Sequence, residues 1–205
     1  MRLLDAERDA LRDGIRAALD ARDGTAALQI AGSLHRYWYS RSAIREGLEW
    51  LNRALEVGHS APITVRARAL YGAGLLSRQR GDYAGAVRHF SEHLALQRDL
   101  TDDLAVARAY NSLAGALHAA GQTKEASEML RESLQVWQRS GDERGLAAAL
   151  ANLGVVACDE ADYAEARRLG TQALEIRLRL QHEEGIAVSY ENLATASLRA
   201  GDHDE

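Results

Sequence analysis

The chain has 205 residues, of which 46% are hydrophobic and 27% are charged, so its composition is that of a folded protein and excludes a disordered one. The formal net charge is −5, and no basic stripe with interleaved aromatic residues is present, which argues against nucleic-acid binding. One proline and many alanines, leucines, arginines and glutamates favour helices over sheet.

Features that would direct the chain out of the cytoplasm are missing from the sequence. Cys158 is the single cysteine and cannot form an internal disulfide, which fits a reducing compartment. The N-terminal residues lack an apolar core of signal-peptide length, and no stretch reaches the roughly 18–20 apolar residues of a membrane span. We therefore expect a soluble, cytoplasmic protein that binds no membrane.

The first predicted elements are three helices ahead of residue 62, which lie at 5–24, 25–40 and 44–58. In the third of them, Gly47, Leu51 and Leu55 match Ala86, Phe90 and Leu94, which lie thirty-nine residues later. In the second, the bulky run Tyr37, Trp38 and Tyr39 replaces the expected alternation of small and large residues. We therefore expect residues 1–61 to be a degenerate helical unit that caps a repeat array.

From residue 62 onward the sequence repeats itself every forty residues. The stretches "GDYAGA" at 81, "GQTKEA" at 121, "ADYAEA" at 161 and "GDHDE" at 201 fall on this period. Tyr110, Leu113, Ala114 and Leu117 have the i, i+3, i+4, i+7 spacing of one helix face, and Ala126, Leu130 and Leu134 form a second stripe after the glycine. Each unit is therefore two helices joined by a tight turn, and the predicted helices are 62–80, 83–99, 102–120, 123–138, 142–160, 163–180 and 183–200.

Polar residues at the predicted helix starts indicate caps. Ser60 precedes the only proline, Thr101 precedes two aspartates, and Ser140 with Glu143 has the spacing of a capping box. Gly170 interrupts the column of large residues formed by Phe90 and Leu130. We expect a neighbouring side chain, Trp137, to fill the space that Gly170 leaves.

The repeat resembles the tetratricopeptide (TPR) family. The stretches "YNSLAGALHAAGQTKEA" and "LANLGVVACDEADYAEA" carry its large-x-x-large-small column, its turn glycine or alanine and its following small residue. The usual period of the family is about 34 residues, so the forty-residue period seen here predicts longer helices. The resemblance implies an all-α, right-handed superhelical TPR solenoid of antiparallel helix pairs, with units 62–101, 102–141, 142–181 and a truncated 182–205.

The same resemblance implies where a partner binds, because the first helices of such units line a concave groove. The column that faces this groove is Gly72, Ser112, Asn152 and Asn192, and an asparagine there can bond the backbone of an extended peptide, since its amide both donates and accepts. Asn111 lies one position earlier in its own unit. The neighbouring groove columns carry Arg68 and Arg108, then Tyr71 and Glu191, then Arg78, His118 and Arg199.

Catalytic and cofactor motifs are absent from the sequence. It contains no phosphate-binding G-x-x-x-x-G-K-[ST], no G-x-G-x-x-G after a strand, no G-x-S-x-G and no H-E-x-x-H. His89 and His93 are spaced i, i+4 and could face a metal ion, but no third ligand is evident, so a packing role is favoured. The sequence therefore predicts a protein that is not an enzyme and that carries no cofactor and no metal.

The N-terminal helices resemble the start of the TPR region in large bacterial signal-transduction ATPases and in LuxR- or SARP-type regulators. This implies a module that binds a partner protein or peptide as the sensor or scaffold part of a larger regulator. The helix at 183–200 carries Ile186, Val188, Tyr190 and Leu193 on a face without a partner helix, so either the chain continues or a second copy covers this end. The alternatives are therefore a free-standing adaptor that homodimerises through this end, and a helical receptor for a small molecule.

Overall fold

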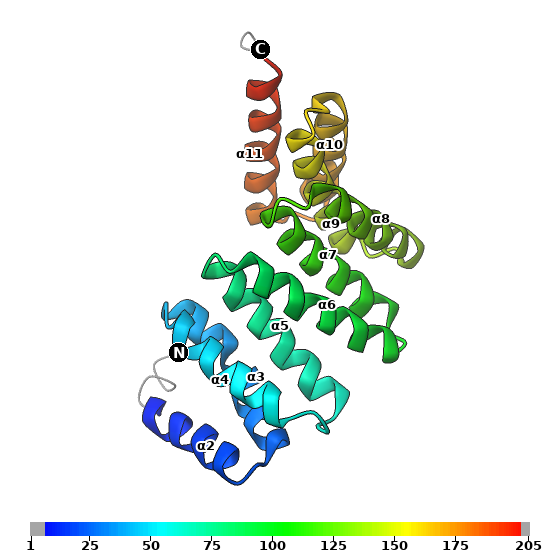
Figure 1. Cartoon of the computed structure of the whole chain (residues 1–205). Coiled ribbons are helices and arrows are strands. Elements are labelled where there is room, and N and C mark those ends of the chain that lie inside the picture. The colour runs from blue at the N-terminus through cyan, green and yellow to red at the C-terminus, as the bar shows by residue number, and fades with distance from the viewer. Residues whose placement is uncertain (1–6, 202–205) are drawn as a thin grey trace. The chain divides into compact units, whose positions relative to one another are not determined.

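The computed structural model describes residues 7–201, and these residues form helices joined by short turns, with no strand among them (Figure 1). Parts of the predicted helix 5–24 and of the "GDHDE" stretch lie outside the described residues. The helices are α2 (Arg8–Asp20), α3 (Gly24–Ser40), α4 (Ile44–Val57), α5 (Ile63–Gln79), α6 (Tyr83–Asp99), α7 (Asp103–Ala119), α8 (Thr123–Ser140), α9 (Glu143–Asp159), α10 (Tyr163–Arg179) and α11 (Glu183–Ala200).

The predicted helices from residue 62 onward are confirmed, and each end agrees within two residues. The predicted boundary at residue 24 was wrong by a few residues. Arg22 has a φ of 54°, which ends α2 early, and the Asp23 side chain caps α3 by accepting a bond from the amide of Ala26. Gly24, expected to close the first helix, therefore opens the second.

The chain divides into two compact units, the first ending at Thr101 and the second beginning at Asp102. In unit 1, α5 packs against α3, α4 and α6, and α2 packs on α3. Arg12 of α2 also donates two bonds, of 2.5 and 2.6 Å, to the carboxylate of Glu46 on α4. In unit 2, α7 pairs with α8 and α9 with α10, while α11 lies against α10 and α9. The first helices α7, α9 and α11 are thus consecutive neighbours.

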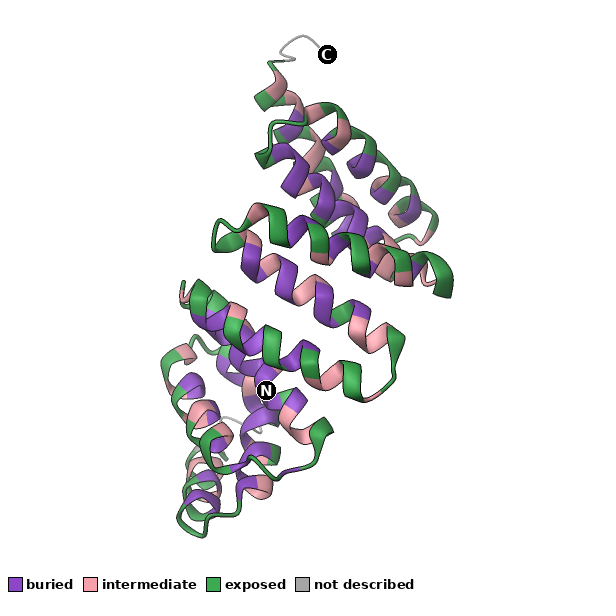
Figure 2. Ribbon diagram, turned by 45° about the vertical axis from the view of Figure 1, so that its right-hand side comes forward, coloured by how far each residue is buried: buried purple, intermediate pink, exposed green. Residues whose placement is uncertain are grey.

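Close contacts between small and large residues hold the helix pairs together. Buried residues gather on the facing sides of the helices, as Figure 2 shows. At Gly74 of α5 an added Cβ would lie 2.7 Å from the ring of Phe90 on α6, and at Gly145 of α9 it would lie 2.3 Å from the ring of Trp137 on α8. These glycines let bulky aromatic rings lie directly on the helix backbone.

The expectation that Trp137 fills the space at Gly170 was wrong. Leu193 of α11 does so, because a Cβ added at Gly170 would lie 2.8 Å from its methyl group. The ring of Trp137 instead packs against Gly145 at the start of α9. The space left in one helix pair is thus partly filled from the following helix.

Aspartates cap the helices at places where the sequence indicated other residues. Asp102 caps α7 by accepting from the amide of Ala105, and Asp142 caps α9 by accepting from the amide of Gly145, each at 2.9 Å. The expected caps Thr101, Ser140 and Ser60 were wrong. Thr101 has a left-handed φ of 54°, the Ser140 hydroxyl donates back to the carbonyl of Trp137, and Pro62 precedes α5 without a side-chain cap bond. The aspartates fit better because their carboxylates lie at the positive ends of the helices.

His89 and His93 are both buried in unit 1. The Nδ1 atom of His93 lies 2.9 Å from the carbonyl oxygen of Ala67, and that of His89 lies 3.3 Å from the Ser77 hydroxyl. Burial lowers the pKa of both rings, that of His89 to about 4. Within residues 7–201, no group of three or more His, Cys, Asp or Glu side chains is placed to hold a metal ion.

Candidate functional site

The first helices of unit 2 border a pocket of about 160 Å³. It opens between α9, α10 and α11, and its wall is built mainly from small side chains, with polar groups contributed by α11 and by the end of α9. Asn192 and Arg199, two of the predicted partner-binding residues, belong to this wall. The lining residues are Ala151, Gly154, Val155, Cys158, Asp159, Ala166, Gly170, Asn192, Thr195 and Arg199.

A second pocket, of about 70 Å³, lies one repeat earlier between α7, α8 and α9. Its lining residues are Ala114, Gly115, His118, Leu130, Asn152, Val155 and Val156. Six of these seven have their counterpart, forty residues later, in the wall of the larger pocket. The two pockets are therefore the same site in successive repeats, and Asn152 and Asn192 occupy the same place in each.

Three charged or polar side chains link the ends of the first helices in unit 2. Asp159, at the end of α9, accepts from Nε2 of His118 on α7 at 2.7 Å and forms an ion pair with Arg199 on α11. The bond from Arg199, and secondarily that from His118, lowers the pKa of the Asp159 carboxyl. Two of the predicted groove residues, His118 and Arg199, are thus held together by one carboxylate, which the sequence did not indicate as part of the site.

The remaining predicted residues of unit 2 are placed differently. Arg108 lies 3.8 Å from Asp102, and the Ser112 hydroxyl donates to the carbonyl of Arg108 at 3.1 Å, so this serine bonds its own helix. The Oδ1 atom of Asn111 is buried and has no hydrogen-bond partner among the described residues. Glu191 is exposed on α11. None of these four side chains lines either pocket.

Arg68, Tyr71 and Arg78 lie on α5 in unit 1, together with the groove-column residue Gly72. The Tyr71 ring packs against His35, Phe90 and His93 at centroid distances of 5.6–6.0 Å, which gives it a structural role. Gly72 is buried against His35, and Arg68 donates to the Ser33 hydroxyl at 3.3 Å. Arg78 is exposed.

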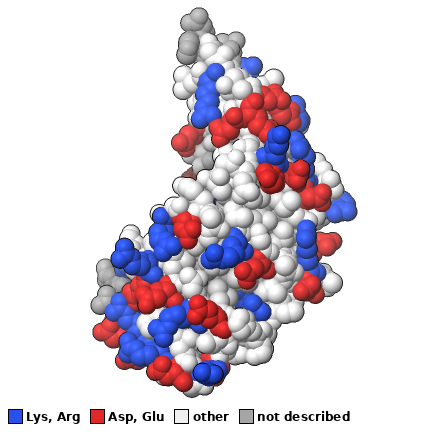
Figure 3. All heavy atoms as spheres, in the orientation of Figure 1, with Lys and Arg blue, Asp and Glu red and all other residues white. Residues whose placement is uncertain are grey.

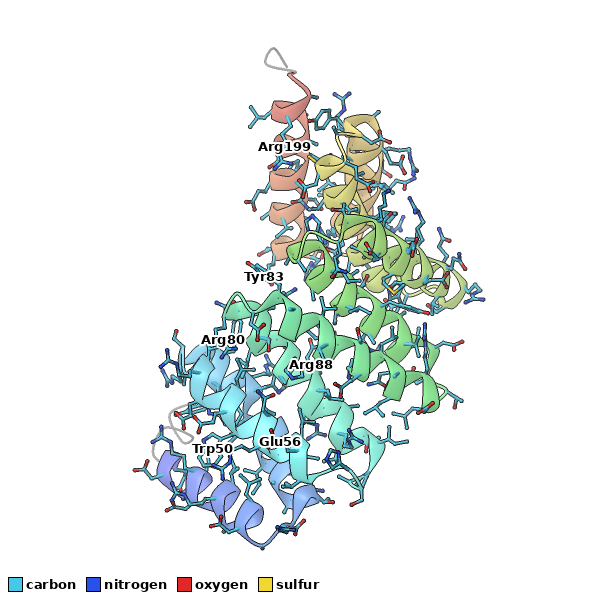
Figure 4. The ribbon with its side chains drawn as sticks, in the orientation of Figure 1. Trp50, Glu56, Arg80, Tyr83, Arg88 and Arg199 are labelled. Atoms are coloured by element: carbon cyan, nitrogen blue, oxygen red, sulfur yellow. The ribbon has the colours of Figure 1, made fainter. Side chains whose placement is uncertain are left out.

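Unit 1 also contains a polar hollow of about 330 Å³ between α4, α5 and α6. Glu56 and Arg88, labelled in Figure 4, belong to its wall, which carries charges of both signs. Arg66 donates from this wall to the carbonyl of His59 at 3.2 Å. None of the eleven predicted binding residues lines this hollow, so it does not coincide with the site expected from the sequence.

Charges of both signs lie together on one face of the molecule. On the face drawn in Figure 3, the acidic and basic side chains of the described residues are interspersed. The helices within residues 7–201 include none that is both long and apolar enough to cross a bilayer. Among the described residues, the pair of equivalent pockets is the feature that brings Asn152 and Asn192 to corresponding places.

The pocket walls were largely missed by the sequence reasoning. Gly154, Val155 and Asp159 line the larger pocket, and the sequence indicated none of them as a binding residue. The one available signal was Gly170, whose break in the column of large residues indicated a space without locating it.

Comparison with known proteins supports the repeat assignment. The sequence matches the tetratricopeptide repeat family over residues 65–139, 105–179 and 145–205. A protein named as an HTH-type transcriptional regulator in Mycobacterium tuberculosis (strain H37Rv) is 31% identical over 150 residues, covering 65% of this chain, and a Mycobacterium bovis regulator matches to the same extent. The chain spans 17% of the length of these curated relatives.

Solved structures show the same fold at low sequence identity. BtubC from P. vanneervenii matches with a TM-score of 0.74 and 19% identity, covering 97% of this chain and 85% of that protein. The TPR-like repeats of a Podosopora anserina protein described as a kinesin light chain give a TM-score of 0.71 at 19% identity, covering 86% and 87%. The apo form of RapI gives 0.73 at 16% identity, covering 88% of this chain and half of RapI.

The predicted fold class, all-α with stacked antiparallel helix pairs, is confirmed by these structures and by the helices themselves. The family match extends over residues 65–205, which is more than half of the sequence. The chain therefore belongs to the tetratricopeptide repeat family.

Proposed function

We propose that unit 2 binds a protein partner as an extended peptide segment that lies along α7, α9 and α11. The observation that carries this proposal is the equivalence of Asn152 and Asn192, which stand at the same place in successive pockets. A carboxamide both donates and accepts, so two of them spaced by one repeat can bond the backbone of one extended chain without reading its sequence. Repeat proteins use such extended surfaces for binding and need no covalent chemistry to do so.

The wider setting that we propose is a cytoplasmic bacterial regulator in which this region is the sensor or scaffold part. The support is the similarity to mycobacterial proteins named as HTH-type transcriptional regulators, of which the chain matches 17% of the length. Sequencing the complete reading frame in the source genome tests this setting. A frame that encodes a DNA-binding or nucleotide-binding domain agrees with it, and a frame that ends with this region contradicts it.

The binding proposal is tested with peptides selected on the full chain from a random dodecapeptide display library. Fluorescence anisotropy of the selected peptides then compares wild type with Asn152→Ala and Asn192→Ala. Loss of a neutral hydrogen bond costs about 0.5–1.5 kcal/mol, so each substitution is expected to weaken binding about 2- to 10-fold. Gln135→Ala is the matched control, because Gln135 is an exposed amide on the second helix α8. Equal affinities in all four proteins would contradict the proposal.

A second candidate function is homodimerisation through α11, favoured by the exposure of its apolar side chains. Val188, Tyr190 and Leu198 are 42%, 56% and 64% exposed. Leu193, expected on this face, instead covers Gly170. Light scattering after size exclusion tests this candidate: a concentration-dependent dimer that Tyr190→Glu abolishes supports it, and a monomer at high concentration removes it.

A further inference from the structure

The two equivalent pockets of unit 2 differ more than twofold in volume, and at four of their six equivalent positions the larger pocket has the smaller residue. The smaller pocket, of about 70 Å³, contains the side chains of Leu130 and His118. At the corresponding places the larger pocket, of about 160 Å³, has Gly170 and Cys158. Ala114 is likewise matched by Gly154, and the bulkier Val155 by Thr195. Val155, which stands where the smaller pocket has Gly115, is the one bulkier residue, so the larger pocket has less side-chain volume at most of the equivalent positions.

The interior of the larger pocket suits an apolar group. Ala151, Gly154, Ala166 and Gly170 present methyl groups and backbone, and the Cys158 thiol is a small apolar side chain in such a setting. The charged residues of the wall, Asp159 and Arg199, are paired with each other, so they leave no uncompensated charge for a ligand to neutralise. Asn192 stands in the same wall with an amide that can reach a peptide backbone.

The size of the pocket sets the size of its occupant. A cavity of about 150 Å³ lined by apolar side chains is known to accept a benzene ring in another protein. The larger pocket is of that size, whereas the smaller one has room for little more than a methyl or ethyl group. Burial of a phenyl, leucine or methionine side chain that would otherwise be exposed is expected to tighten binding about 10- to 100-fold.

The distance between the two pockets determines how many ligand residues separate the two side chains that occupy them. Neighbouring packed helices lie about 8–10 Å apart, and an extended chain advances about 3.3 Å per residue. Successive pockets are therefore about two or three ligand residues apart. A peptide that bonds Asn152 and Asn192 would place one small and one large side chain at this separation.

We propose that the larger pocket is the anchor site for one bulky apolar side chain of the partner, and that the smaller pocket takes a small side chain two or three residues away. This inference rests on the proposed function, since it names what the peptide bound along α7, α9 and α11 must contain. Specificity then comes from one repeat, while the neighbouring repeat contributes mainly backbone bonds.

The experiment uses the selected peptides and the full chain. Replacing the bulky apolar residue of a peptide by alanine is expected to weaken binding at least 10-fold. Gly170→Leu places in the larger pocket the side chain that Leu130 has in the smaller one. Its new Cβ would lie 2.8 Å from a methyl carbon and 3.2 Å from the Cγ atom of Leu193, a flexible side chain. Thr195→Trp blocks the pocket from the exposed side of α11 and tests the same point if Gly170→Leu fails to fold. Each variant is expected to bind the original peptide no more tightly than it binds the alanine peptide.

A measurement on the unaltered protein gives an independent result. Cys158 is the single cysteine and lines the larger pocket, so its rate of reaction with a small thiol reagent reports occupancy there. A saturating peptide is expected to slow this reaction at least 5-fold, and the alanine peptide at the same concentration is expected to slow it far less.

The outcomes separate the two proposals. If binding depends on Asn152 and Asn192 but the filled pocket keeps full affinity, or Cys158 reacts at the same rate with and without peptide, the anchor site is wrong and the binding face stands. If no selected peptide depends on the asparagines, the proposed function fails. If such asparagine-dependent peptides carry no shared bulky apolar residue, the anchor site alone is overturned.

Discussion

Within each forty-residue repeat, a small residue on the first helix packs against a large residue on the second. This pairing can be tested by replacing the pair of one repeat with the pair of the next. In unit 1 the pair is Gly74 and Phe90, and one repeat later the equivalent positions hold Ala114 and Leu130. All four residues are buried, with Phe90 and Ala114 at 0% exposure. The perturbation is the double substitution Gly74→Ala with Phe90→Leu, measured together with both single substitutions.

The structure gives the expected magnitudes. A Cβ at Gly74 would lie 2.7–2.8 Å from three ring atoms of Phe90, and the fully buried ring cannot turn away into solvent. Such overpacking costs about 1–3 kcal/mol, against a gain of about 1 kcal/mol from replacing a helical glycine by alanine. Gly74→Ala alone should therefore lower the free energy of unfolding by about 0–2 kcal/mol. With leucine at position 90 the clash is relieved, and the same change should raise it by about 1 kcal/mol.

Equilibrium urea unfolding, followed by circular dichroism, measures the free energy of unfolding of the wild type, the two single variants and the double variant. Peptide-resolved hydrogen exchange shows whether the change lies in α5 and α6. The coupling free energy between the two sites is expected to be about 1–3 kcal/mol, because the sites are in direct contact. If Gly74→Ala has the same effect in both backgrounds within about 0.5 kcal/mol, the contact does not govern the choice of residues, and the reasoning is refuted.

Three further predictions concern stability. Burial lowers the pKa of His89 to about 4, below the 6.5 of an unfolded histidine, so the stabilisation by the neutral ring is complete above pH 6.5 and is lost as the pH falls towards 4. The free energy of unfolding in urea should therefore fall by up to about 3 kcal/mol across this range. His89→Gln should make this dependence of stability on pH weaker. Ala161, at a φ of 62°, stands where Gly121 has a φ of 79°, so thermal melts should show Ala161→Gly stabilising and Gly121→Ala destabilising by about 1 kcal/mol each. Asp142→Ala should lower the free energy of unfolding in urea by about 1 kcal/mol, and Ser140→Ala should lower it by less. The opposite order would show that the serine caps α9.

The helices could be predicted because the sequence repeats, so each position of the helical pattern is observed in several repeats. Tyr110, Leu113 and Ala114 recur with equivalent residues in the neighbouring units, so a chance pattern in one unit is outweighed by the others. The helix caps were harder to predict, since "SGDE" offers two side-chain acceptors, Ser140 and Asp142, two residues apart. Only the backbone angles decide that Asp142 and not Ser140 lies at the N-cap.

The pockets were predictable only in part, and the reason is physical. The column of Asn152 and Asn192 was indicated by the resemblance to the TPR family, once the forty-residue period had aligned the repeats. The pocket walls depend on which neighbouring helix fills a missing side chain, and this is a property of packing between units. At Gly170 the space is partly filled by Leu193 from α11, twenty-three residues later, so no spacing within one unit could reveal it.

The position of Gly170 explains how pocket size can change without loss of the fold. Loss of a large side chain from the core of one helix pair would ordinarily leave a cavity, with a cost that grows with its volume. Here Leu193 covers Gly170 from the next repeat, and the remaining space opens on the side where Asn192 and Thr195 stand. The repeat can thus alter one column to reshape a binding pocket, while the following helix maintains the packing that the altered column no longer provides.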